Sequence, residues 1–304
     1  MVELILKATV ILAAAAAASR LLAKRPAAER HLLWTVAAGA LLLLPVFSVT
    51  LPEWRVPVPG VPGFGVPLFR VQTSAGPERA AAPSPRPATT PPQPPQPRRP
   101  FDPRAALPAL WASGAALGLL RLAVGAVAAV RVRRSCMPAS EAWREALARS
   151  RQDLGIARPV DLLEAGGQAM PMACGLLRPA VIVPSGAGQW DAGQRRAVLL
   201  HELAHVRRYD VLTHLVAQTA WALYWFHPLA WYAAREMRRE RERACDDLVL
   251  EARVRASDYA AQLLEIARVF RPPALAAWAG LAMARRSQLE SRLLAILDSG
   301  RRRA

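Results

Sequence analysis

The sequence predicts a mostly α-helical polytopic membrane protein in which transmembrane helices are followed by a smaller α+β domain. Hydrophobic residues make up 53% of the 304 residues, although the formal net charge is +17. These two properties are compatible only if apolar and charged residues are segregated along the chain. The segregation is present, because three long apolar stretches precede a C-terminal half in which helix signals dominate and two short runs are typical of strands.

The three apolar stretches cover residues 4–22, 32–51 and 105–130. The second has no charged residue in 20 positions, enough for a helix to cross about 30 Å of hydrocarbon. A cleaved signal peptide is the alternative for the first stretch, but the second follows without a polar cleavage region, which favours an uncleaved helix. We therefore expect two spans joined by a short cytosolic loop in residues 1–51, and a third span in residues 105–130.

Basic residues flank these stretches on one side of the membrane. They are Arg20, Lys24, Arg25 and Arg30 between the first two stretches, and Arg131, Arg133 and Arg134 after the third. Cytoplasmic loops carry an excess of Lys and Arg, so both clusters are expected in the cytoplasm. The N-terminus and residues 52–104 would then be external, and residues 131–304 would form a cytosolic domain.

The predicted external loop, residues 52–104, holds 16 of the chain's 27 prolines. Such a composition cannot bury enough apolar area to fold alone, so we expect an extended or polyproline II segment. A semi-rigid linker is the simpler interpretation, and a sensing or wall-contacting segment is the alternative.

The positive charge suggests nucleic acid at first sight, but the membrane explains it more simply. Anionic lipid attracts arginines that flank spans, and the sequence contains no zinc finger, recognition helix or aromatic-basic motif. We expect the lipid bilayer as a partner and no direct nucleic-acid contact. Cys136, Cys174 and Cys245 are odd in number and lack C-x-x-C spacing, which predicts reduced thiols rather than disulfides.

Local signals predict the elements of the C-terminal domain in order. They are a helix over residues 140–154 closed by Gly155, strands over residues 160–163 and 180–183, a helix opened by a capping box at Asp191 and Gln194, a helix from Ser257 to Pro272, and a last helix opened by Ser287 and Glu290.

Residues 211–234 carry no charge apart from one on His214 or His227, and they resemble a fourth span. Residues 211–226 would give only about 24 Å of helix, which is too short to cross comfortably. Pro228 suits the first position of a new helix with His227 as its N-cap, so the chain is expected to turn there. We predict a helical hairpin that dips into the membrane or lies against the spans, with a buried soluble hairpin as the alternative.

His201, Glu202 and His205 form an H-E-x-x-H motif on the helix that the capping box opens. Residues i and i+4 lie on one face of a helix, so both imidazoles can reach one Zn²⁺ at about 2.1 Å. Glu202 can then hold and deprotonate a water at the ion. The motif also occurs by chance on ordinary helices, so a third ligand is needed to support a metal site.

Glu242 and Asp246 offer two carboxylates on a later helix, again at positions i and i+4. Glu242 can complete a His₂Glu site with an open fourth position, and Asp246 can accept the outer N–H of a ligating histidine. Glu240 competes with Glu242, since the two lie about 200° apart around the helix and only one can face the ion. Apolar periodicity leaves the choice between them open.

Several segments together resemble the BlaR/MecR family of membrane-bound zinc peptidases. They are residues 171–184 with the pattern P-x-x-x-G-x-x-x-P-x-V-x-x-P, residues 225–231, residues 242–250 with E-x-x-x-D about 37 residues after H-E-x-x-H, and residues 287–297. The resemblance implies a gluzincin-like zinc metallopeptidase domain with Glu242 as the third ligand and Asp246 behind it. It also implies a bacterial inner-membrane location, a role in signal transduction, and cleavage of a cytosolic transcriptional repressor or of the chain itself.

The best-known members of that family continue through another span into an external penicillin-binding sensor, whereas this chain stops after Arg303 and Ala304. Acylation by β-lactams needs a serine with a nearby lysine, and the chain has no S-x-x-K and only Lys7 and Lys24. We therefore expect a separate membrane protein to act as sensor, and a homodimer is one option for the assembly.

The sequence thus predicts an integral-membrane zinc endopeptidase with Glu202 as general base. An edge strand at Val181, Ile182 and Val183 is expected to hold the substrate. Candidates for oxyanion stabilisation, by proximity in sequence, are Arg208, Tyr209 and His214. The rival functions are a membrane quality-control protease similar to HtpX-type enzymes and a non-catalytic scaffold with a structural zinc. Glu202 argues against the scaffold, because a structural site needs no base.

Overall fold

The computed structural model describes residues 2–50, 103–166, 170–269, 286–298, 300 and 303. Its N-terminal part consists of the long helices α1 (Val2–Leu21), α2 (Ala27–Thr50) and α3 (Pro103–Ser135). All three are long and apolar enough to cross a membrane, over Glu3–Leu21, Ala27–Ser48 and Ala106–Ser135. The predicted fold class, mostly α with membrane spans and a small sheet, is confirmed.

Two of these helices are longer than the apolar stretches that predict them. Helix α2 already begins at Ala27, and α3 continues past Val130 to Ser135. Helical hydrogen bonding does not stop where an apolar run stops, so the charged turns stay helical. Arg133 in the last turn of α3 donates to the Arg178 carbonyl oxygen at 2.6 Å and pairs with Asp161 at 2.5 Å, which joins α3 to the sheet.

A four-stranded sheet follows α3. Its strand order is β1 (Met137–Pro138), β2 (Asp161–Ala165), β4 (Ala180–Pro184) and β3 (Met172–Cys174). Strands β2 and β4 are parallel, whereas β1 and β3 are antiparallel to their neighbours. The predicted strands correspond to β2 and β4. Strands β1 and β3 have only two and three residues, too few for an alternating pattern to reveal.

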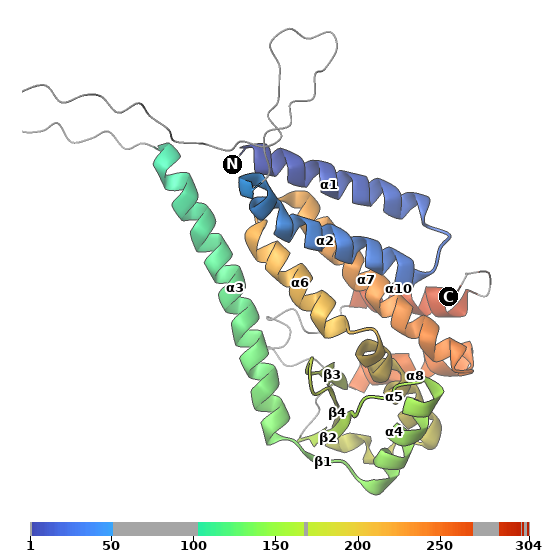
Figure 1. The fold of residues 1–304 in the computed structure, drawn as a ribbon. Coiled ribbons are helices and arrows are strands. Elements are labelled where there is room, and N and C mark those ends of the chain that lie inside the picture. The colour runs from blue at the N-terminus through green and yellow to red at the C-terminus, as the bar shows by residue number, and fades with distance from the viewer. Residues whose placement is uncertain are drawn as a thin grey trace, which may run out of the picture.

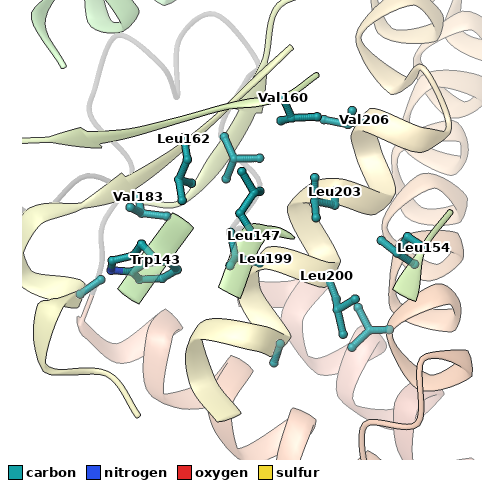
Figure 2. Packing of buried hydrophobic residues seen from close by; sticks show 14 of the residues in the cluster. Trp143, Leu147, Leu154, Val160, Leu162, Val183, Leu199, Leu200, Leu203 and Val206 are labelled. Carbon is teal, nitrogen blue, oxygen red and sulfur yellow. The ribbon is translucent and has the colours of Figure 1, made fainter. Parts of the chain in front are cut away.

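The largest hydrophobic core of the part that follows α3 lies between the sheet and the helices α4 (Glu141–Asp153) and α5 (Ala192–Arg207). Trp143 and Leu147 of α4 are buried with Leu199 and Leu203 of α5 and with Val183 of β4 (Figure 2). A 3-10 turn, Ser185–Gln189, connects β4 to α5. Burial of α5 on the sheet places the H-E-x-x-H residues inside the molecule.

Three helix ends match the local signals, whereas α10 (Arg286–Leu297) begins before the predicted cap Ser287. Gly155 closes α4 with a φ of 62°, a left-handed conformation that glycine adopts without strain. Asp191 caps α5 as a capping box, because its Oδ1 accepts from the Gln194 N–H at 2.8 Å and the Gln194 side chain accepts from the Asp191 N–H at 3.1 Å. Pro228 opens the next long helix after the N-cap His227.

Helices α6 (Asp210–Leu223) and α7 (Pro228–Glu251) form a hairpin that packs against the candidate spans. Figure 1 shows α6 between α2 and α3, with α7 running along α2. Ala220 and Ala230 of the hairpin are buried with Leu12 of α1 and Leu41 of α2. Insertion of this hairpin into the membrane stays a prediction.

The remaining helices are α8 (Ala256–Val269) and α10 (Arg286–Leu297). Helix α10 contacts both α7 and α8, and α8 also contacts α5. The helix end predicted at Pro272 and the proline-rich residues 52–102 lie outside the described residues.

Candidate metal centre

Three predicted ligands from two helices far apart in the sequence meet in the structure. His201 and His205 lie one turn apart on α5, with ring centroids 5.0 Å apart, and Glu242 lies on α7, which packs against α5. The ligand atoms of all three residues lie within 4.8 Å of one another, and all three residues are buried.

Several buried polar atoms at this point are unsatisfied by the protein. His205 Nε2, Glu242 Oε2 and Glu202 Oε2 have no hydrogen-bond partner among the described residues. His201 Nε2 lies 3.7 Å from Glu242 Oε2, beyond hydrogen-bond distance. Burying such atoms unpaired is costly, and two imidazole nitrogens with one carboxylate oxygen are a typical donor set for Zn²⁺. The residues therefore fit a divalent metal ion with a fourth position left for water or substrate.

The second ring nitrogen of His201 is held by Asp246 and Tyr259. His201 Nδ1 lies 3.3 Å from Asp246 Oδ1 and 3.0 Å from the Tyr259 hydroxyl, which itself donates to Asp246 Oδ1 at 2.7 Å. Because Nδ1 faces these groups, Nε2 is left for the ion. Asp246 thus lies behind a predicted ligand, and Tyr259 is a neighbour that the sequence reasoning missed.

His205 is oriented in the same way by Asp210, which the sequence reasoning also missed. His205 Nδ1 lies 2.8 Å from Asp210 Oδ2, and the Cys245 thiol donates to the same oxygen at 3.3 Å. Asp210 begins α6 directly after Tyr209, whose left-handed backbone with a φ of 55° turns the chain. Helical periodicity could not reveal this contact, because a turn separates Asp210 from the helix that carries His205.

The two carboxyl groups that α7 provides at this site, Glu242 and Asp246, are ionised despite their burial, because the pKa of each is lowered. Burial would raise the pKa of Asp246, but the nearby Arg292 guanidinium and the hydrogen bond with His201 lower that pKa to about 2. Burial also opposes ionisation of Glu242, yet the neighbouring His201 ring and the Arg241 and Arg292 guanidiniums hold its pKa well below the usual range. Burial and Arg292 would lower the pKa of His201, whereas the neighbouring Asp246 and Glu242 carboxylates raise it to about 9. Metal binding at neutral pH would therefore release a proton from this ring.

Glu240, the competing candidate for the third ligand, contacts other residues. Its Oε2 accepts from Arg30 Nε at 2.9 Å and Nη2 at 2.6 Å, and its Oε1 accepts from Arg243 at 2.9 Å. Both oxygens of Glu240 are therefore engaged by arginines. Glu242 also has an arginine partner, because its Oε1 accepts from Arg241 at 3.1 Å, but its Oε2 has no hydrogen-bond partner among the described residues and lies 3.7 Å from His201 Nε2.

The residues considered for oxyanion stabilisation also have defined contacts. Arg208 donates to His31 Nδ1 at 3.0 Å and lies 3.4 Å from Asp210 Oδ1. The other two contact arginines, Tyr209 with the Arg158 guanidinium 4.2 Å from its ring centre and His214 with Arg241 at 3.4 Å. Arg208 thus acts on the carboxylate that orients His205.

The prediction that Val181, Ile182 and Val183 form an edge strand that holds the substrate is wrong. These residues belong to β4, an inner strand with β2 on one side and β3 on the other, and each is at most 1% exposed. An inner strand has its backbone groups already paired, so it cannot accept a substrate strand. The run is uniformly apolar, and such a run indicates burial without distinguishing an edge strand from a central one.

Comparisons with known proteins add to this geometry. The family model described as BlaR1 peptidase M56 matches residues 1–296. The regulatory protein BlaR1 of Bacillus licheniformis is 38% identical over 81 residues, which cover 27% of this chain and 14% of that protein. The similarity to this relative is therefore confined to a small part of its length. Because the family model spans almost the whole chain, the chain belongs to the BlaR1 peptidase M56 family of membrane-associated metallopeptidases.

Proposed function

We propose that this chain is an integral-membrane zinc endopeptidase that cleaves a cytosolic protein, either a transcriptional repressor or the chain itself, in signal transduction. The observation that supports this most is that the ligand atoms of His201, His205 and Glu242 lie within 4.8 Å of one another. Glu202 directly follows the first of these residues in the sequence. Glu202 is buried, and one of its oxygens has no partner among the described residues. A structural metal site needs no such carboxylate, which argues against the scaffold function.

The proposed reaction is hydrolysis of a peptide bond by water. Zn²⁺ held by His201, His205 and Glu242 would polarise the scissile carbonyl and acidify the attacking water. Glu202 accepts a proton from that water and later returns it to the leaving amine. Asp246 and Asp210 each hold the Nδ1 side of one imidazole, which keeps both Nε2 atoms directed toward the ion.

We place the extended substrate on the outer edge of β3. This strand pairs with β4, with Ala173 opposite Val181, and packs against α5. Within the described ranges its other edge pairs with no strand. Ala173, Cys174 and His205 line one small cavity, so this edge lies beside a proposed ligand. A strand added there would gain main-chain hydrogen bonds and reach the metal centre.

The orientation of the proposed enzyme follows from the basic flanks of the spans. We propose that the N-terminus and residues 52–104 are external and that residues 131–304 are cytosolic. The relative's description as a regulatory protein supports a signalling role. Reporter fusions at residues 75, 160 and 300 should behave as external, cytosolic and cytosolic, respectively. An external reporter at residue 300 would show that the α6–α7 hairpin crosses the membrane completely, contrary to this topology.

The decisive experiment compares membranes that contain the wild-type chain with membranes that contain Glu202→Gln. We expect the variant to retain one metal ion per chain but to lose cleavage, so that one repressor accumulates uncleaved. Accumulation of many misfolded proteins would instead support the quality-control function. Unchanged cleavage by Glu202→Gln, or a wild-type protein that binds no metal, would refute the proposed mechanism.

A further inference from the structure

Arg292 on α10 is a buried cation beside the proposed metal centre. It is 5% exposed and makes two hydrogen bonds to Asp246, from Nε to Oδ2 at 2.9 Å and from Nη2 to Oδ1 at 2.7 Å. Its Nη1 also lies 3.5 Å from Glu242 Oε2, and its Nη2 lies 3.5 Å from His201 Nε2. One guanidinium thus reaches two carboxylates of α7 and a ring of α5.

Arg292 lies where it can offset the electrostatic repulsion between two buried carboxylates. Glu242 and Asp246 lie one turn apart on α7, and like charges at this spacing repel each other. Both are buried, where water screens the repulsion poorly. Burial of a guanidinium costs desolvation free energy unless the group is fully paired, so Arg292 is not explained by packing alone. Its planar fork matches the two oxygens of Asp246, a match that the single ammonium of lysine cannot make.

We propose that Arg292 is a positioning residue of the metal centre: it fixes the Asp246 carboxylate, and through it the His201 imidazole, in the orientation that binds the ion. The C-terminal helix α10 therefore completes the metal centre, although it provides no ligand. This inference rests on the proposed metal site of His201, His205 and Glu242. The Tyr259 hydroxyl also supports this carboxylate through its contacts with Asp246 and His201, whereas Arg292 additionally lies 3.5 Å from Glu242 Oε2 and so bridges the two carboxylates.

The test uses the full chain, purified in detergent, with Arg292→Gln and Arg292→Lys. Metal affinity is measured by competition with a chelator, and the coordination geometry is read from the visible absorption of the Co²⁺-loaded protein. We expect Arg292→Gln to lower metal affinity about 10–100-fold and to change the Co²⁺ spectrum. Arg292→Lys keeps the charge but loses the two-point contact, so it should restore only part of the affinity.

A matched control separates positioning from simple packing of α10. Ile296 lies on the same helix and is 1% exposed in the hydrophobic core. Ile296→Ala should lower the melting temperature but leave the Co²⁺ spectrum of the folded protein as in the wild type. If Arg292 acts through Asp246, Arg292→Gln combined with Asp246→Asn should lose little more affinity than the stronger single variant.

The outcomes distinguish this inference from the proposed function. Wild-type metal affinity and Co²⁺ spectrum in Arg292→Gln would overturn the role of Arg292 while the metal site itself stands. The role of Arg292 would also be overturned if Ile296→Ala changed the Co²⁺ spectrum as Arg292→Gln does, because loss of α10 packing would then explain both spectral changes. A wild-type chain that binds neither Zn²⁺ nor Co²⁺ would instead refute the proposed function, and the inference with it.

Discussion

Arg30 of α2 and Glu240 of α7 form a buried ion pair between a candidate membrane span and the helix that carries Glu242. Their side chains are 6% and 5% exposed, and their closest atoms lie 2.6 Å apart. Arg30 Nη1 also donates to the carbonyl oxygens of Ala23 at 2.9 Å and Arg25 at 2.6 Å. One guanidinium therefore joins the α1–α2 connection to α7, the helix that carries Glu242.

Arg30→Gln should destabilise the fold by about 3–5 kcal/mol, because it leaves the buried Oε2 atom of Glu240 without its cation while Arg243 still contacts Oε1. Unfolding of the protein in detergent micelles, followed by circular dichroism, measures the loss. Arg149→Gln is the control, since Arg149 pairs with Glu145 at the surface, with side chains 73% and 62% exposed. That control should cost about 0.5 kcal/mol or less. Equal losses in the two variants would contradict a structural role of the buried pair.

Glu242→Ala and Glu240→Ala should differ in metal content. Glu242→Ala removes a proposed ligand, so the purified protein should lose its bound ion. Glu240→Ala should retain one ion per chain while becoming less stable, because Arg30 then loses its partner. Elemental analysis of both purified variants provides the measurement. Metal loss in Glu240→Ala together with full retention in Glu242→Ala would show that the third ligand is assigned to the wrong residue.

Asp210→Asn should weaken metal affinity about 10–100-fold, because His205 loses the carboxylate that orients its ring. Competition with a chromophoric chelator measures the affinity. Asp153→Asn is a suitable control, since Asp153 pairs with Arg196 at 2.8 Å outside the metal centre and its side chain is 38% exposed. Its metal affinity should equal that of the wild type. An Asp210→Asn protein with unchanged affinity would exclude the orienting role.

Gly118→Ala should destabilise the packing of α3 on α6. A Cβ at Gly118 would lie 2.8 Å from Ala222 Cβ and 2.9 Å from Ala222 Cα, so one helix must shift. Overpacking of this kind costs about 1–3 kcal/mol. At Gly39 in α2 a Cβ would meet no atom within 4 Å. Gly39→Ala should therefore be neutral or stabilising by up to about 1 kcal/mol. Thermal unfolding of both variants in one detergent checks the difference, and a stable Gly118→Ala would argue against close contact of α3 and α6.

Interactions between residues close in sequence determined the position of many of the helices. The apolar stretches, the capping box of Asp191 and Gln194, the Pro228 start of α7 and the spacing of His201 and His205 all depend on residues within a few turns of one another. Such signals are complete in the sequence, because the atoms that interact are already neighbours along the chain. The pair Glu242 and Asp246 was also recognisable, although choosing Glu242 over Glu240 required the resemblance to a known family.

Only the tertiary structure decided which partner each buried group received. Glu240 is turned to Arg30, which lies 210 residues away in the sequence. Strand β4 became an inner strand because β3, a strand of three residues, pairs with its second edge. Asp210, Tyr259 and Arg292 reach the metal centre from three further helices. Buried charges and backbone groups must find partners when helices and strands pack, and the pattern within one segment carries no information about the distant segment that supplies the partner.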